Sequence, residues 1–542
     1  MNLALTTEML QSVRYTGAVY TPIPVARAIS ELVVSLTPEP SHRILEPSVG
    51  DGAFLSTLAT KLPEANYTVV DINQSVIESL LHSREYIEKN VKFHVGDFIE
   101  FACDHIENGS DPFDLIIGNP PFIRRHNFSQ TFRDALVRIG DLSKYPENKI
   151  KNSWTAFLVL CSKMISKNGT LALILPYELM TVKYGQFSLW NLMSYFNRID
   201  IFVPNERAFP AIDQDAVLFI GRMNSILESG LFLQHVKSLE NINDSKEYKI
   251  EAKSIDEIST EINGFIIDRE TLDSIRVQRL KLPKILDVCV SSPGIVTGAN
   301  DFFILDDEKV KQLELEPYSL PILKRGSLST KLPIFTKEDF SNASAREATN
   351  LIKISVPKEE IPFAAQRYLA EGEEEKLDQR YKCRHRPLWY NVPISQPTEG
   401  FFFRRSHDFP RLCINEAGVY ITDNSYGVVP LPGRSIRGLC FSFYNSLTFL
   451  FSEIDGRFYG GGVLELSPSE FKNLPIPYYE PSEEEFNAFI DAHQKAKGNP
   501  DAILDFGDSW LANKLSLSSL QLRGIRASWH AMRSHRLRHG RR

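Results

Sequence analysis

The feature that most constrains the fold is the stretch Leu115–Phe122, where an apolar run ends in Gly-Asn-Pro-Pro-Phe. The apolar residues predict a short buried strand. The two prolines then exclude both a helix and further pairing in a sheet, because proline lacks an N–H and has a fixed φ. We therefore expect Asn119 at the end of a strand, followed by a stiff turn. Alone, the pattern also fits a proline-rich turn after a core strand.

The side chains of this turn suit a planar substrate that carries an amino group. The side-chain oxygen of Asn119 and the carbonyl oxygen of Pro120 can both accept hydrogen bonds from an exocyclic NH2 group. Phe122 supplies a flat apolar face on which a ring can stack. These three residues are our candidates for the catalytic part of a site.

A glycine-rich turn lies upstream, where Glu46-Pro-Ser-Val-Gly-Asp-Gly52 follows an apolar strand and precedes a helix. Glycines at such a turn let a ligand approach the main chain, as in the nucleotide sites of doubly wound sheets. The spacing differs from the dinucleotide fingerprint. Glu46 and Asp51 would repel phosphates and attract an ammonium group, so the turn favours an amino-acid-like cofactor.

Two more acids follow predicted strands, Asp71 after residues 67–70 and Asp97 after residues 91–95. Each alone also fits a solvated loop carboxylate. Their recurrence at successive strand ends indicates the ligand-binding edge of a doubly wound sheet. Thr21 stands just before a predicted helix, where by itself it fits an N-terminal cap.

In their order along the chain, Tyr20-Thr-Pro22, Glu46 to Gly52 and Asn119 to Phe122 resemble the gamma-class amino DNA methyltransferases. Members of that family methylate adenine N6 in restriction-modification systems. The resemblance implies that Thr21, Glu46, Asp71 and Asp97 hold S-adenosylmethionine. It also implies double-stranded DNA as the substrate and allows for a separately encoded restriction endonuclease as a partner.

A later segment, Arg207-Ala-Phe-Pro210, resembles the part of the family whose aromatic residue stacks on the extruded base. The resemblance therefore implicates Phe209 in catalysis. The same residue fits a core aromatic at the start of a strand equally well.

Two other functions stay open. An N5-glutamine protein methyltransferase shares the Asn-Pro-Pro motif, because an amide NH2 is also planar and weakly nucleophilic. A large second domain rich in basic and aromatic residues speaks against it. A catalytically silent DNA-binding subunit is the other alternative, and the intact motifs speak against that one.

The length of 542 residues exceeds what one hydrophobic core supports, so several domains are expected. We expect an α/β fold with a doubly wound, mostly parallel sheet, as in class I S-adenosylmethionine-dependent methyltransferases, followed by a β-rich mixed target-recognition domain. The predicted boundaries are 1–270 for the catalytic domain, 271–480 for the target-recognition domain and 481–542 for a helical extension with a basic tail.

Basic residues interleaved with aromatic ones in the second domain suit phosphate contacts and base stacking. The candidates for DNA binding are Lys324, Arg325, Arg384, Arg386, Arg404 and Arg405. Any one of them also fits a solvated charged surface. The end of the chain from Arg523 carries seven arginines and no acid, which fits either extra phosphate attraction or a disordered end.

Composition adds exclusions. No apolar run approaches the roughly 20 residues needed to cross a bilayer, and the N-terminus lacks a signal-peptide pattern, so we expect a cytoplasmic protein without a membrane partner. The six cysteines are scattered without a Cys-x-x-Cys pair, which argues against a metal site and a disulfide framework. The net charge of −7 is weak evidence for or against DNA binding.

Overall fold

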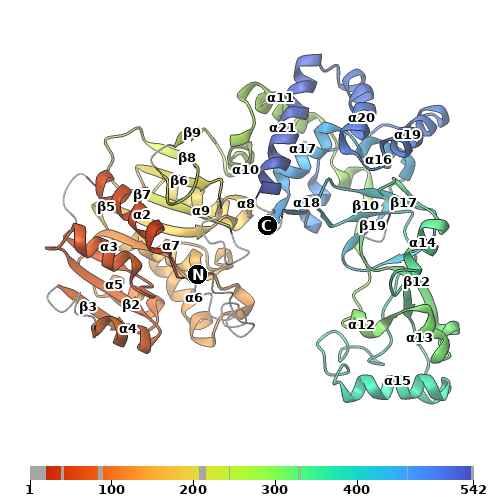
Figure 1. Cartoon of the computed structure of the whole chain (residues 1–542), viewed down its shortest axis with the longest axis horizontal. Helices are drawn as coiled ribbons and strands as arrows, with labels where there is room; N and C mark the ends of the chain where they lie inside the picture. Colours follow the sequence, from red (N-terminus) through yellow and green to blue (C-terminus); the bar gives the residue numbers. More distant parts are fainter. Residues whose placement is uncertain are drawn as a thin grey trace. The chain divides into compact units, whose positions relative to one another are not determined.

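The computed structural model describes residues 20–37, 42–82, 90–206, 215–242, 245–326, 329, 331–459 and 462–538. The chain divides into two compact units, which Figure 1 shows in the colours of the sequence. Unit 1 is essentially Met1–Phe265, and unit 2 consists of Ile266–Phe458 and Gly462–Arg536. Within these described ranges, no helix is long and apolar enough to span a membrane.

Unit 1 is built on a nine-stranded sheet with the strand order β3-β2-β1-β4-β5-β7-β6-β8-β9. Its strands are β1 (Arg43–Glu46), β2 (Asn66–Asp71), β3 (Val91–Val95), β4 (Phe113–Gly118), β5 (Ile165–Pro176), β6 (Arg198–Pro204), β7 (Ala216–Arg222), β8 (Gly230–Val236) and β9 (Lys246–Ile250). The strands from β3 to β5 pair in parallel, whereas β7 pairs antiparallel with both β5 and β6.

Strand β1 is flanked by β2 on one side and by β4 on the other, so the order of the strands reverses there. In doubly wound sheets, ligands bind beyond the carboxyl ends of the strands at this kind of reversal. The expected doubly wound sheet is therefore confirmed, and its topology points to the ends of β1, β2 and β4.

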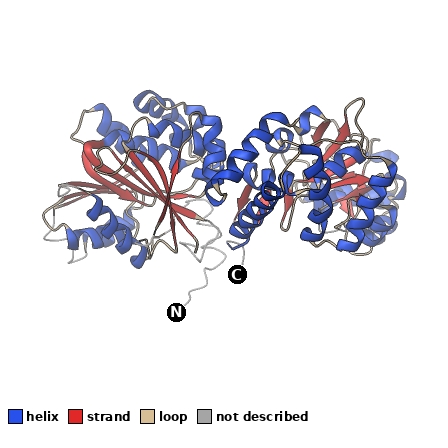
Figure 2. Cartoon of the chain, turned by 90° about the horizontal axis from the view of Figure 1, so that it is seen from above, coloured by secondary structure: helices blue, strands red, loops and turns tan. Residues whose placement is uncertain are grey.

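Helices cover both faces of the sheet, as Figure 2 shows. They are α2 (Ile23–Leu36), α3 (Ala53–Lys61), α4 (Gln74–Leu81), α5 (Phe98–Glu107), α6 (Gln130–Ser143), α7 (Ser153–Met164), α8 (Glu178–Thr181), α9 (Lys183–Met193) and α10 (Ile255–Asn263). Successive side chains of a strand point to opposite faces of the sheet. On one face, Ile44 and Leu115 belong to a core shared with α2, α3 and α4. The rings of Phe98 and Phe157 stack at 4.4 Å where α5 meets α7.

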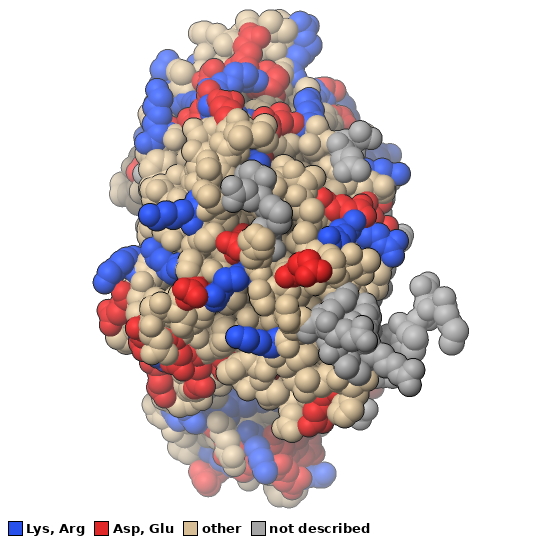
Figure 3. All heavy atoms as spheres, turned by 90° about the vertical axis from the view of Figure 1, so that its left-hand side faces the viewer, with Lys and Arg blue, Asp and Glu red and all other residues tan. Residues whose placement is uncertain are grey.

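The surface of unit 1 is mixed in charge. On the face seen in Figure 3, Lys and Arg side chains are interspersed with Asp and Glu. The described residues of this face therefore carry small groups of both signs and no broad patch of one sign.

Unit 2 contains several smaller sheets, with the orders β10-β19-β15-β17-β13, β11-β14-β12-β18 and β16-β21-β20. Their strands are β10 (Cys289–Pro293), β11 (Ile304–Leu305), β12 (Ser319–Leu323), β13 (Ile334–Phe335), β14 (Asn350–Ile352), β15 (Gly400–Phe403), β16 (Arg405–Ser406), β17 (Leu412–Asn415), β18 (Tyr420–Ile421), β19 (Ser425–Pro430), β20 (Arg457–Tyr459) and β21 (Val463–Glu465). The expectation of a second domain with further β-sheets is confirmed.

Helices make up much of unit 2 as well. They are α11 (Arg269–Lys281), α12 (Asn300–Phe303), α13 (Asp307–Gln312), α14 (Lys337–Ser344), α15 (Phe363–Glu374), α16 (Ile436–Phe443), α17 (Ser446–Asp455), α18 (Pro468–Asn473), α19 (Glu483–Ala496), α20 (Pro500–Leu515) and α21 (Ser519–Arg538). Four of them start with a capping box or a proline in the first turn, which matches the start signals of helices.

The C-terminal helices belong to the main core of unit 2. Trp529 of α21 is fully buried in the same cluster as Phe449 of α17 and Phe489 of α19. Arg536 forms a buried ion pair with Glu453 at 2.8 Å and also donates to the carbonyl oxygens of His407 and Gly462. A disordered end is therefore the wrong description of the chain from Arg523 to Arg538.

Candidate active site

The acids and the asparagine singled out in the sequence gather at one edge of the unit 1 sheet. Strand β1 pairs in parallel with β2 and β4, so Glu46, Asp71 and Asn119 all stand at carboxyl ends of adjacent strands. Strand β3 pairs in parallel with β2, which places the Gly96-Asp97 turn beside them. Parallel pairing brings these residues together because parallel strands all have their carboxyl ends at the same edge of the sheet.

The turn after β1 is held on the end of β2. Val49 N donates to Val70 O at 3.0 Å, and Gly50 N donates to Asp71 Oδ2 at 2.9 Å. Gly50 has φ +52°, and a Cβ atom there would lie 3.1 Å from the ring of Tyr20. Both the backbone conformation and the aromatic ring against it require glycine at this position.

Glu46 is a buried acid, only 4% exposed. Burial raises the pKa of its carboxyl well above 4.5, a hydrogen bond from the main-chain N–H of Leu55 acts in the opposite direction, and the charges of Asp51 and Asp71 raise it further. Among the described residues, no Lys, Arg or His forms an ion pair with Glu46. A buried carboxyl without a cation suits the ammonium group of a ligand.

The two aspartates also have structural roles. Asp71 accepts a second main-chain hydrogen bond from Asn73 N at 2.9 Å. Asp97 caps helix α5 by accepting from Ile99 N at 2.8 Å. Each carboxylate oxygen has two lone pairs, so these bonds orient the side chains and leave further acceptor capacity toward a ligand.

The Asn-Pro-Pro motif lies directly against the Glu-Pro turn. The hydroxyl of Ser48 donates to the carbonyl oxygen of Asn119 at 3.0 Å. A Cβ atom on Gly118 would lie 3.0 Å from the Cδ atom of Pro47, which measures how closely the two segments approach. Asn119 Nδ2 donates to the hydroxyl oxygen of Thr21 at 3.3 Å, so Thr21 joins the same group.

A serine on helix α7 clamps the chain that follows the motif. Ser153 Oγ accepts from Ile123 N at 2.8 Å and donates to Pro121 O at 2.5 Å. Ser153 is buried, and the next residues are joined further because Arg125 N donates to Lys151 O at 2.9 Å. Pro120 is buried and Phe122 is half-buried within this clamped turn.

Sequence reasoning missed Ser48 and Ser153, because each binds the main chain of a residue 71 or 32 positions away. For Ser48, its place inside the Glu-Pro turn was the only available signal. The predicted Phe209 lies outside the described residues.

The six predicted DNA-binding residues have very different surroundings. Arg404 and Arg405 both bind the buried carboxylate of Glu465 at 2.6 Å, Lys324 pairs with Asp301 at 2.7 Å, and Arg325 pairs with Glu347. Arg386 donates to the carbonyl oxygens of Val296, Thr297 and Trp389.

Arg384 differs from the other five. Its side chain is exposed and its guanidinium lies 5.4 Å from the ring centre of Tyr381, which is 67% exposed. Lys382 approaches the same ring at 5.8 Å. A cationic group beside an exposed aromatic ring is the arrangement that suits nucleic acid best among these six candidates.

The site offers acids, amides and main-chain groups for its chemistry. Over the described part of the chain, no group of three or more His, Cys, Asp or Glu side chains could hold a metal ion. The described cysteines are buried thiols, and burial raises the pKa of Cys103 to about 11. The arrangement can bind a cation with Glu46 and present the amide of Asn119 beside it.

Each of the two units is matched by a model of a known protein family. A family model for the Eco57I restriction-modification methylase matches residues 21–206. A second model, for the C-terminal domain of the Type II methyltransferase M.Eco57I, matches residues 264–512.

Relatives of similar length match across both units. The chain is 22% identical over 411 residues to the Type II methyltransferase M.AccI of Acinetobacter calcoaceticus, covering 74% of this chain and 73% of the relative. It is 23% identical over 501 residues to M.XamI of Xanthomonas campestris pv. amaranthicola, covering 86% of this chain and 85% of the relative. A solved DrdV–DNA complex shares the fold, with a TM-score of 0.50, 12% identity, and coverage of 90% of this chain and 58% of the solved one.

Proposed function

We propose that this chain, which resembles the Eco57I restriction-modification methylase over residues 21–206 and the C-terminal domain of M.Eco57I over residues 264–512, transfers a methyl group from S-adenosylmethionine to N6 of an adenine in duplex DNA. The resemblance noted in the sequence is confirmed, and the coarser statement, a DNA methyltransferase of a restriction-modification system, follows from the family. The cofactor, the target atom, the residue roles and a cytoplasmic location are our proposal.

The observation that carries the proposal is the contact between the two motifs. Ser48 binds the carbonyl of Asn119, and Thr21 binds its side-chain amide. The group that would present an amino nitrogen is therefore fixed beside the turn that would hold a cationic cofactor. This is the juxtaposition that transfer from a cofactor to an amino group requires.

The residues of the β1 turn fit S-adenosylmethionine better than a phosphate-bearing cofactor. Glu46 is a buried acid suited to the ammonium group, and Asp71 and Asp97 retain acceptor capacity for hydroxyl and amino groups. When bound, this cofactor supplies an electrophilic methyl group. Lys or Arg side chains of the kind that hold phosphates do not line this turn in the sequence from Glu46 to Phe54.

In the proposed mechanism, the target adenine leaves the duplex, which costs a few kcal/mol. Stacking on Phe122, and on Phe209, offsets part of this cost. The side-chain oxygen of Asn119 and the carbonyl oxygen of Pro120 would accept hydrogen bonds from the two N6–H groups and orient the nitrogen lone pair toward the methyl group of the cofactor. The new N6–methyl bond would replace the methyl–sulfur bond of the cofactor, and N6 would release one proton to solvent. Positive charge develops on N6 during transfer, so these acceptors stabilise the transition state more than the ground state.

The same geometry is compatible with an amide substrate, so an N5-glutamine protein methyltransferase is the second candidate. Against it stands unit 2, which matches the C-terminal domain of the Type II methyltransferase M.Eco57I over residues 264–512. A catalytically silent DNA-binding subunit is the third candidate function. DNA binding alone does not require the orientation of the Asn119 amide by Thr21.

One assay separates the three functions. The full chain is incubated with S-adenosylmethionine carrying a labelled methyl group and with duplex DNA and protein in the same tube. We expect label in DNA, recovered as N6-methyladenine after digestion to nucleosides. Label in protein, or in no macromolecule, would overturn the proposal. A partner restriction endonuclease is a separate part of the proposal, tested by challenging the methylated DNA with a co-encoded nuclease.

A further inference from the structure

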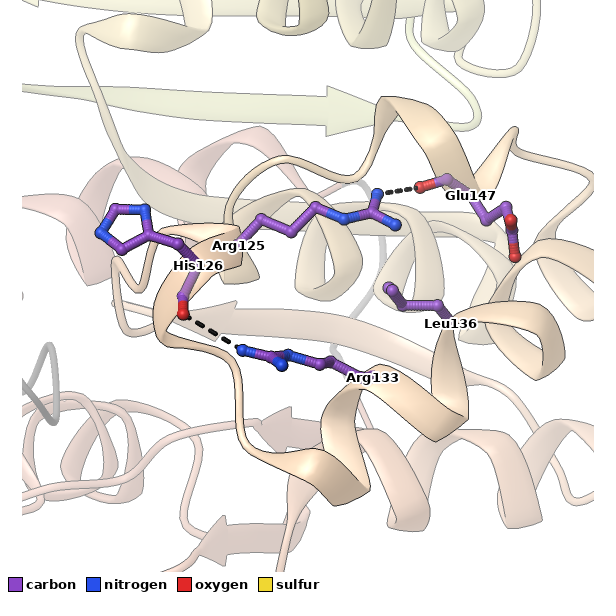
Figure 4. Close-up of a pocket in the computed structure, with 5 residues that line it drawn as sticks. All are labelled: Arg125, His126, Arg133, Leu136 and Glu147. Carbon is purple, nitrogen blue, oxygen red and sulfur yellow. Dashed lines mark hydrogen bonds between the residues drawn. The ribbon is translucent and has the colours of Figure 1, made fainter. Parts of the chain in front are cut away.

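A hollow of about 640 Å³ opens on unit 1 shortly after the Asn-Pro-Pro-Phe motif. It is lined by Arg125, His126, Arg133, Leu136 and Glu147, and we call it the arginine hollow. Figure 4 shows Arg125 and Arg133 extending into it from opposite sides, Arg125 from the turn η1 (Arg125–Asn127) and Arg133 from α6. None of these residues has a part in the mechanism above.

Main-chain acceptors fix both guanidinium groups. Arg125 Nη1 donates to the carbonyl oxygens of Glu147 at 3.0 Å and Ile150 at 3.1 Å, and Arg133 Nη2 donates to that of His126 at 3.1 Å. Figure 4 shows that Arg125 reaches the main chain of Glu147, not its carboxylate. These bonds orient the guanidinium groups without cancelling their charge.

Neither arginine forms an ion pair with any described residue. Arg138, on the same helix as Arg133, provides the contrast, because it binds Asp104 and Glu107 at 2.6 Å each. Glu147 is a single carboxylate at the rim of the hollow, set against two arginines. The hollow therefore keeps a net positive charge and unused N–H donors.

The surrounding segment strengthens this charge. Residues 123–151 contain seven Lys or Arg and three Asp or Glu, a formal charge of +4 in a chain whose total is −7. Helix α6 begins beside the hollow and has no acid in its first turn, so the positive end of its dipole is not offset there.

The hollow is held at a fixed place relative to the motif. Ser153 clamps Pro121 and Ile123, and Arg125 N donates to Lys151 O. Arg125 follows Phe122 by three residues, so their Cα atoms are at most about 11 Å apart. An anion held by Arg125 would thus be bound by the segment that directly follows Phe122.

We propose that the arginine hollow binds a backbone phosphate of the DNA strand that carries the target adenine, next to the extruded nucleotide. This inference rests on the proposed function and adds a contact to it. The planar fork of arginine matches a phosphate with two parallel hydrogen bonds, and the main-chain acceptors have already oriented it. A phosphate held there would keep the strand in place while the base is turned toward Asn119.

The test uses the full chain and a short fluorescent duplex, with binding measured over a range of salt concentrations. The variants are Arg125→Gln, Arg133→Gln and the double variant, and the matched control is Arg138→Gln on α6. Arg133→Gln guards against misfolding, since among the described residues the side chain of Arg133 makes one hydrogen bond, to the exposed carbonyl of His126. Binding of S-adenosylmethionine is measured in parallel as a check on the catalytic edge of the sheet.

Binding weakens as salt rises, so log K falls with log salt, and each lost phosphate contact makes this negative slope shallower by about 0.9. We expect Arg125→Gln and Arg133→Gln to bind DNA several-fold more weakly, with slopes that are shallower by about 0.9, and Arg138→Gln to match the wild type. Unchanged slopes and affinities in the double variant, while the wild type still methylates DNA, would overturn the inference alone. A wild type that neither binds nor methylates duplex DNA would overturn the proposed function together with it.

Discussion

The side-chain nitrogen of Asn119 lies 3.3 Å from the hydroxyl oxygen of Thr21, a residue 98 positions earlier in the chain. Because Nδ2 donates to Thr21, the side-chain oxygen occupies the other end of the planar amide of Asn119. Thr21 thus sets which end of the amide is presented to a substrate. The resemblance implies that Thr21 holds the cofactor, and from this contact we propose a second role for it, as a positioning residue.

Replacing Thr21 with valine tests that role. The change keeps the size of the side chain and removes the acceptor for Nδ2, at a cost of about 1 kcal/mol in orientation of the amide. We expect the single-turnover methylation rate at saturating S-adenosylmethionine to fall roughly 5- to 10-fold, and Thr21→Ser to restore the rate. Loss of cofactor affinity at an unchanged rate would assign Thr21 to the cofactor alone.

Glu46 should make the cofactor-free protein less stable as the pH rises. Burial raises its pKa in the folded state well above 4.5, so the folded chain binds a proton more tightly than the unfolded chain does. The stability linked to this group is fully present below pH 4.5 and is lost as the pH rises through the folded pKa. Glu46→Gln, which resembles the protonated form, should therefore be more stable than the wild type at neutral pH.

Denaturant unfolding at several pH values measures this effect. We expect the advantage of Glu46→Gln to shrink as the pH falls toward 4.5 and the variant to bind S-adenosylmethionine much more weakly. Equal stability of the wild type and Glu46→Gln at neutral pH would show that burying the ionised Glu46 carboxylate does not destabilise the folded protein.

Asp71 should contribute to cofactor binding directly. Removing a charged hydrogen-bond acceptor costs about 1–3 kcal/mol, so Asp71→Ala should weaken S-adenosylmethionine binding by that amount in calorimetry. Asp71 also accepts from Gly50 N, so the alanine variant loosens the turn as well. Asp71→Asn retains an acceptor for Gly50, and an affinity equal to that of the wild type in this variant would mean that the charge of Asp71 does not matter.

The buried pair Arg536–Glu453 should be essential to unit 2. Breaking one partner of a buried ion pair costs about 3–5 kcal/mol, because the other charge stays buried. We expect Arg536→Ala to lower protection of α17 and α21 amides in hydrogen exchange. The exposed pair Arg437–Glu483 is the matched control, and Arg437→Ala should cost at most about 1 kcal/mol. Equal protection in both variants would contradict this role for Arg536.

The fold of unit 1 could be predicted because its signals are local. Apolar runs end at Glu46, Asp71 and Asn119, and parallel strands bring such ends to one edge. The clamp at Ser153 could not be predicted, since it depends on which helix follows the motif in space. The position of β7 between β5 and β6 could not be predicted either, because an alternating apolar pattern identifies a strand but not its neighbours in the sheet.

Single charged residues were the least predictable part. Arg404 and Arg405 looked accessible to phosphate, yet both bind Glu465, which lies 61 and 60 positions further along the chain. Arg125 and Arg133 carried no such signal in the sequence and stand unpaired with acids in the described structure. Tertiary contacts decide whether an arginine is paired with an acid, so only the folded structure distinguishes the paired arginines from the unpaired ones.

The central claim is that Asn119 holds the amino group of the target adenine, N6, in position to receive the methyl group. Its most direct test is single-turnover methylation of duplex DNA by the wild type and by Asn119→Ala, with cofactor affinity measured on the same preparations. We predict a rate lower by two or more orders of magnitude, about 3 kcal/mol or more in the barrier, with S-adenosylmethionine bound as tightly as by the wild type. A near-normal rate of N6-methyladenine formation by Asn119→Ala would contradict the account.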